Sequence, residues 1–116
     1  MCYNDLPYML VCTFPHLKKE VTSFLQSDGK LYHVMYESIL CPYVNSLLEA
    51  DSENELNRVF DFYEKMAVCE DEEVKNLLQV TLLENLFDNK SLYKKAVKYM
   101  HASTRAICRS IEEYMR

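Results

Sequence analysis

Apolar residues recur three or four positions apart in the second half of the chain, which is the spacing of one face of an α-helix. Within residues 53–69 they are Leu56, Val59, Phe60, Tyr63, Met66 and Ala67. Ser52 and Glu55 have the spacing of a capping box, so we expect this helix to begin there. In residues 72–88 the apolar positions surround the axis, which predicts a central helix covered on most sides. A third pattern predicts one long amphipathic helix over residues 91–114.

The first half has a less regular pattern. Phe14-Pro15 opens a predicted helix, and Gly29, the single glycine, ends it as a left-handed turn residue. Residues 31–50 have a helical pattern with Pro42 inside it. Because proline lacks a backbone N–H and clashes with the preceding turn, we expect two segments, 31–40 and 42–50. Residues 2–12 fit either a helix or an extended arm.

The connections between these segments favour antiparallel neighbours, so the C-terminal half should be a three-helix up-down-up array. One glycine and three prolines supply few of the tight turns that a many-stranded protein needs. A chain of 116 residues has the size of one domain with one core. The sequence therefore predicts an all-α, single-domain bundle of antiparallel helices over residues 1–116, with HEAT-like stacked helical hairpins as one form of it.

The number of cysteines and the hydropathy of the chain indicate the cellular compartment. The five cysteines are odd in number and widely spaced, which is typical of free thiols in a reducing cytoplasm. No apolar run approaches the roughly 20 residues that span a bilayer. No basic stretch precedes the short apolar run at residues 8–12, so we expect neither a membrane span nor a secretory leader.

The charge is unevenly distributed. The net charge is −5, and residues 49–73 carry ten acids against two bases, whereas residues 90–116 carry seven bases against two acids. If the helices are antiparallel, the acidic loops 49–55 and 70–73 lie at opposite ends of one helix, and Asp61 and Glu64 join them. The result would be an acidic rim, which either keeps the protein soluble or docks a basic partner, with Tyr63 as an aromatic anchor.

Catalytic and metal-binding patterns are missing from the sequence. The three histidines are far apart, and one glycine cannot build a nucleotide-binding loop. Cys41, beside Pro42 and downstream of His33 and Glu37, is the best candidate nucleophile, although the burial preference of cysteine favours a structural role. We therefore expect no enzyme activity, no metal and no cofactor.

Glu84 stands out because it interrupts an apolar run, Leu82 to Leu86, in the predicted central helix. A carboxylate inside such a helix is costly unless it is paired or lies at an opening. For the Glu84 side chain, we favour an orientation towards solvent over a functional contact.

Several segments together resemble a family of small bacterial proteins of unknown function. They are Phe14-Pro15, Asp28-Gly29-Lys30-Leu31, Phe60-x-Phe62-x-Glu64, Asp71-Glu72-Glu73-Val74-x-Asn76 and Leu82-Leu83-Glu84-x-Leu86. Such proteins are similar in character to the small acidic immunity proteins that neutralise bacterial toxins. By position, the resemblance makes Glu64, Asp71, Glu73, Asn76 and Glu84 the residues to test.

The leading hypothesis is a non-enzymatic protein-binding module, in its most specific form an immunity protein that masks a toxin. Its predicted contact residues are Tyr63, Glu64, Glu70, Asp71, Glu72, Glu73, Asn76 and Glu84. One alternative is a ligand-binding or enzymatic pocket that uses Cys41, His33 and Glu84. Another is nucleic-acid binding through Lys94, Lys95, Lys98, Arg105 and Arg109 of the last helix, which the acidic net charge disfavours.

Overall fold

The computed structural model describes residues 1–115, which contain helices and turns and no strand. The first half comprises η1 (Tyr3–Asp5), α1 (Leu6–Thr13), η2 (Pro15–Leu17), α2 (Lys18–Asp28), α3 (Tyr32–Met35), η3 (Tyr36–Leu40) and α4 (Cys41–Ala50). The second comprises α5 (Glu53–Ala67), α6 (Glu72–Leu77), η4 (Leu78–Leu83), α7 (Glu84–Phe87), α8 (Lys90–Val97) and α9 (Ala102–Met115). The all-α prediction is confirmed. Residues 2–12, left open by the sequence, are mostly helical.

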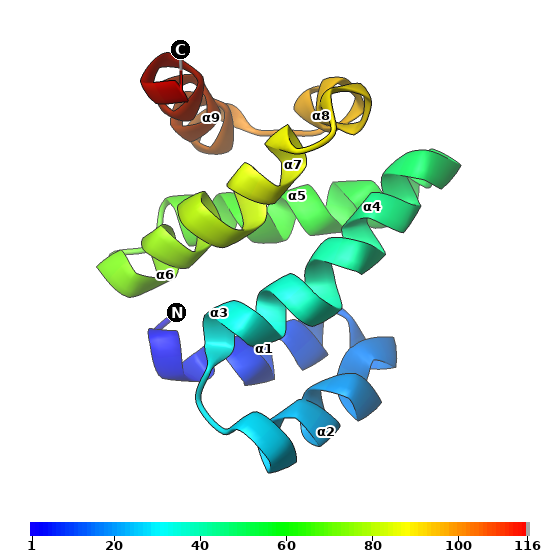
Figure 1. Cartoon of the computed structure of the whole chain (residues 1–116), viewed down its shortest axis with the longest axis vertical. Coiled ribbons are helices and arrows are strands. Elements are labelled where there is room, and N and C mark those ends of the chain that lie inside the picture. Colours follow the sequence, from blue (N-terminus) through cyan, green and yellow to red (C-terminus); the bar gives the residue numbers. More distant parts are fainter. Residues whose placement is uncertain (116) are drawn as a thin grey trace.

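The helices are stacked along the long axis of the molecule (Figure 1). α1 and α2 lie at one end, α8 and α9 at the other, and α4, α5 and α6 occupy the middle. α5 packs against α4, η4 and α9, so it touches both halves of the chain. The N-terminus lies near the start of α6, which brings the first residues beside the acidic loop at 70–73 (Figure 1). The likeness to HEAT repeats stays a prediction.

A single apolar core of buried residues extends from α1 to α9. The chain has a radius of gyration of 13.5 Å, and a compact chain of this length is expected at about 13 Å. Phe14, Tyr36, Phe60, Phe62 and Tyr63 are among its largest fully buried side chains. The rings of Phe14 and Phe62 meet edge to face at 6.1 Å, which joins the N-terminal layer to α5.

The chain stays helical from Tyr32 to Ala50, so the predicted break into two segments at Pro42 is wrong. The proline is accommodated by η3, a π-helical turn that ends just before α4. Its backbone is widened by one residue, and the Cys41 N–H bonds to the Tyr36 carbonyl five positions back. Since a widened turn relieves the clash between the proline ring and the preceding carbonyls, the helix bends without ending.

The predicted helix over 91–114 is two helices, α8 and α9, separated by a turn at residues 98–101. The C-terminal half is therefore not the three-helix array expected from the sequence. The turn is held from outside: one Glu64 carboxylate oxygen accepts hydrogen bonds from the Thr104 N–H and hydroxyl at 2.9 Å, and the other accepts from the Ser103 N–H at 3.2 Å. These are donors of the first turn of α9, which a helix cannot satisfy by itself.

The central helix predicted over 72–88 is present as α6, η4 and α7 without interruption. Val74, Leu77, Leu78, Leu82, Leu83 and Leu86 are buried along it. It contains a second π-helical turn, in which the Glu84 N–H bonds to the Gln79 carbonyl. The capping box predicted at the start of α5 does not form, because Ser52 makes no side-chain cap bond and Glu55 accepts the Tyr43 hydroxyl at 2.8 Å instead.

Candidate functional site

The acidic rim predicted along α5 is interrupted by α9, which packs over it. Asp61 pairs with His101 at 2.7 Å, just before α9. Glu64 caps α9 as described above. Burial alone would raise the pKa of Glu64, but hydrogen bonds from Thr104 and Ser103 outweigh burial and hold that pKa below its ordinary value. Glu64 therefore holds two helices together and is not free for a partner.

The acids at the other end of α5 are also engaged. Asp51, at the left-handed end of α4, pairs with Lys95 of α8 at 3.2 Å. The same lysine donates to the Leu48 carbonyl at 3.2 Å, so a cation caps the carboxyl end of α4. Since the ends of α5 are about 21 Å apart and the acids between them are used internally, the continuous rim is not present.

Two further predicted contact residues have structural roles. The Tyr63 side chain is 1% exposed, and burial raises its pKa, so it cannot anchor a partner in this structure. Asp71 accepts from the Tyr3 N–H at 2.8 Å and from the Glu73 N–H at 2.9 Å. These bonds lower the pKa of the Asp71 carboxyl, the bond from Tyr3 most of all. Asp71 thus caps α6 and ties the N-terminal residues to it.

The other five predicted contact residues are exposed on one stretch that runs from the loop before α6 to the start of α7. We call this stretch the acidic face; it consists of Glu70, Glu72, Glu73, Asn76 and Glu84. The exposed positions of the helix, which also include Gln79 and Val80, recur three or four residues apart, so they lie on one side. Lys75 pairs with Glu72 at 3.6 Å and is the base next to this face.

The acidic face ends in a small polar groove of about 170 Å³ beside Glu84. Glu37 of η3 and Asp88 line it together with Glu84, and Val80, Thr81 and Asn85 complete its walls. Only the packing of η3 on η4 brings Glu37 to this surface, whereas Asp88 lies four positions after Glu84 in the chain. The groove extends the negative charge of the face around the molecule.

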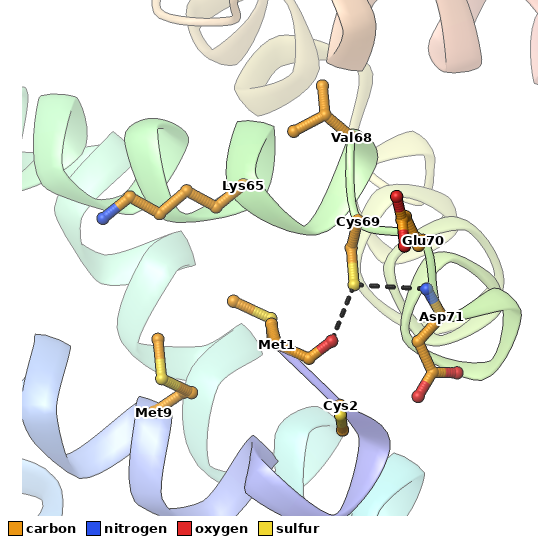
Figure 2. Close-up of a pocket in the computed structure, with 8 residues that line it drawn as sticks. All are labelled: Met1, Cys2, Met9, Lys65, Val68, Cys69, Glu70 and Asp71. Carbon is orange, nitrogen blue, oxygen red and sulfur yellow. Dashed lines mark hydrogen bonds between the residues drawn. The ribbon is translucent and has the colours of Figure 1, made fainter.

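An apolar groove opens at the other end of the acidic face (Figure 2). It has a volume of about 760 Å³, and Met1, Met9 and Val68 supply its apolar surface. Lys65 lies at one end and Glu70 at the other (Figure 2). No sequence pattern predicts this groove, because its walls come from residues more than 55 positions apart in the chain.

The residues of the alternative catalytic hypothesis gather around Thr81. His33 Nδ1 lies 2.9 Å from the Thr81 hydroxyl, and the Cys41 thiol lies 4.0 Å from the Thr81 carbonyl. Burial, and then the nearby Glu37 carboxylate, raise the pKa of Cys41 to about 12. The thiol is therefore protonated at neutral pH, which is the state of a structural cysteine rather than an activated nucleophile.

One comparison with known proteins decides the family. The model of DUF7674, a domain of unknown function, matches residues 8–116, which is nearly the whole chain. The chain belongs to the DUF7674 family. No curated protein and no solved structure matches it. The resemblance to an uncharacterised family is thus confirmed, whereas bacterial origin and immunity function stay predictions.

In this DUF7674 chain, the motifs behind the resemblance divide by burial. Phe14, Phe60 and Phe62 are in the core, and Glu64 and Asp71 cap helices. Glu73, Asn76 and Glu84 are exposed on the acidic face. Most motif residues therefore have structural roles. The three exposed ones, Glu73, Asn76 and Glu84, are the motif residues that can contact a partner.

The bases proposed for nucleic-acid binding do not lie on one helix, because α8 and α9 divide them. Lys95 is held by Asp51 and Leu48. The Arg105 Nε donates to the Val97 carbonyl at 3.3 Å, within the turn between α8 and α9. These two bases hold helix ends, and the single basic helical surface expected from the sequence is absent from residues 1–115.

None of the helices within residues 1–115 combines the length and apolar character of a bilayer-spanning helix. The same residues hold no group of three or more His, Cys, Asp or Glu side chains arranged to bind a metal ion.

Proposed function

We propose that this DUF7674 chain is a non-enzymatic module that binds and masks a basic partner protein through its acidic face. The observation that supports the proposal is the division of the acids into two sets. Asp51, Asp61, Glu64 and Asp71 bond to other parts of the fold. The acids of the acidic face point to solvent.

An exposed acidic face favours a partner with a basic surface. Complementary charge raises the association rate and selects against acidic partners, while screening by salt weakens it. The net charge of −5 adds a long-range attraction of the same sign. The expected partner is therefore a protein with clustered Lys or Arg side chains.

In its most specific form, the proposal makes the chain a cytoplasmic immunity protein that neutralises a toxin. The resemblance in character to small acidic immunity proteins supports this form, and family membership leaves it open. The direct experiment is co-expression with the product of the neighbouring gene. If the neighbour arrests growth, co-expression should restore growth and the two proteins should co-purify.

The surface is tested by charge reversal with a matched control. Glu70→Lys/Glu73→Lys alters two exposed acids of the acidic face, and Glu49→Lys/Glu53→Lys makes the same change at the far end of α5. We expect the first variant to bind the partner about tenfold or more weakly and the second to bind within about threefold of wild type. Equal losses in both would show that only net charge matters, and unchanged binding of the first would contradict the proposal.

A second candidate function is favoured by the arrangement around Thr81. Both π-helical turns meet there, and such turns are frequent at functional sites. His33, Cys41 and Glu84 would then serve a small ligand in the polar groove. The protonated state of Cys41 places this candidate behind protein binding, and thiol labelling, described in the Discussion, tests it.

A further inference from the structure

The apolar groove between the N-terminal residues and the end of α5 has a role that the acidic face alone does not explain. Val68 is 62% exposed directly after α5, and Met1 and Met9 line the same groove (Figure 2). Solvent-exposed apolar groups gathered around a concave surface are typical of interaction sites. Methionine side chains are flexible and polarizable, so they adapt to the shape of what they contact.

The walls of the groove are fixed by bonds that do not depend on an occupant. The Cys69 thiol donates to the Met1 carbonyl at 2.9 Å, and the Asp71 N–H donates to the same sulfur at 3.4 Å (Figure 2). Asp71 also accepts from the Tyr3 N–H, as described above. Because the N-terminal residues are held against the 69–71 loop, the groove is formed before binding, which lowers the entropy loss on association.

The charges around the groove specify its occupant. Glu70 lies at one end, and Glu72 and Glu73 continue the acidic face beyond it. We propose that the groove receives a large apolar side chain from a segment of the partner protein, with a Lys or Arg directly beside it that meets Glu70. The inference rests on the proposed function, because it names the chemistry of the partner segment.

The first test needs no known partner. A random library of displayed 12-residue peptides is selected against the whole chain. The enriched peptides should carry Leu, Ile, Phe, Met or Trp within two positions of a Lys or Arg. Enrichment of basic peptides without an apolar residue, of apolar peptides without a base, or of no peptide at all overturns the inference.

A pair of matched substitutions then separates apolar packing from charge. Val68→Glu removes apolar surface from the groove but adds a carboxylate that would attract a basic peptide. Val34→Glu makes the same change at a valine that is 44% exposed and lies outside the groove. The enriched peptide should bind Val68→Glu about tenfold more weakly and Val34→Glu within about twofold of wild type. Equal or tighter binding by Val68→Glu overturns the inference.

Methyl NMR of the wild-type chain gives a readout that is independent of the variants. On addition of the enriched peptide, the methyl signals of Met1 and Met9 should shift, and those of the fully buried Met35 and Met66 should not. Shifts confined to other methionines overturn the inference. If the experiments on the groove give a negative result but Glu70→Lys/Glu73→Lys still weakens binding of the partner, the proposed function stands. If that variant binds like wild type, the proposed function fails.

Discussion

Replacing Glu64 by glutamine should weaken the attachment of α9 to α5. The carboxylate accepts three hydrogen bonds, from the Ser103 N–H, the Thr104 N–H and the Thr104 hydroxyl. The first two come from the amino end of α9, where the helix dipole also favours a negative charge. Glutamine keeps the shape of the side chain, but its amide has one acceptor oxygen and no charge.

The expected size of the effect follows from these contacts. Loss of a capping interaction costs about 1 kcal/mol, and loss of the charge at the helix end costs about 0.3–1 kcal/mol. Glu64→Gln should therefore lower the free energy of unfolding by roughly 1–2 kcal/mol at pH 7, which corresponds to a fall in Tm of about 4–8 °C. Glu37→Gln, an exposed glutamate in the middle of a helix, is the matched control and should change stability by less than about 0.5 kcal/mol.

The pH dependence of this stability difference tests whether the negative charge of Glu64 is its cause. The folded pKa of Glu64 lies below its ordinary value of 4.5, so its stabilisation is complete above that value and is lost as the pH falls through the folded pKa. In urea denaturation, wild type and Glu64→Gln should differ at pH 7 and converge towards pH 3. An equal difference at both pH values would refute the reasoning, because the stabilisation would then not depend on the charge.

Two further predictions concern the core. The Tyr36 hydroxyl donates to the Leu6 carbonyl at 2.7 Å in a buried setting. Tyr36→Phe should therefore lower the free energy of unfolding by about 1–2 kcal/mol in the same urea assay. An unchanged free energy of unfolding would contradict that hydrogen bond. The Cys41 thiol, with its pKa near 12, should react with a thiol reagent at pH 8 roughly a thousandfold more slowly than the exposed Cys12. Labelling of Cys41 as fast as Cys12 would instead favour the catalytic alternative.

The sequence predicted those elements whose signals are local. α5 has its apolar stripe within one segment, and Gly29 adopts the positive φ of 65° that a turn residue after a helix requires. The central helix was predicted from apolar residues on all sides; six of them are buried, but Val80 is 43% exposed, so one side of the helix faces solvent. Each of these signals lies within the element that it predicts.

The predictions that were wrong depend on contacts between residues that are far apart in the chain. No glycine or proline marks the turn between α8 and α9, and the carboxylate that caps α9 comes from a residue 39 positions before Ser103. The π-helical turn before Pro42 replaces a break with a bend, because η4 packs against it. Burial of Cys41 agrees with the structural role that the sequence favours for it. Burial of Tyr63 agrees with its position on the apolar stripe of α5 but contradicts its predicted use as an anchor.

The candidate site was predicted only in part, again because the sequence does not specify how the helices pack together. Composition located the acids, but it could not divide acids that hold helix ends from acids that face solvent. Cys12 is exposed although its neighbours in the sequence are apolar, since that face of α1 lies outward. The groove of Met1, Met9 and Val68 could be found only after the N-terminal residues were placed beside the 69–71 loop.

The grouping of the acidic face is hard to explain by folding alone. Glu72 and Glu73 lie in the first turn of α6, where they favour the helix dipole, yet Asp71 already caps that helix. Glu70 lies outside the helix, and Glu84 lies near its far end. Like charges in one region repel one another, and solubility needs only net charge, which could be spread over the surface. Because charge–dipole attraction in α6 accounts for only part of this grouping, the grouping favours the proposed partner that meets both the acids and the preformed apolar groove.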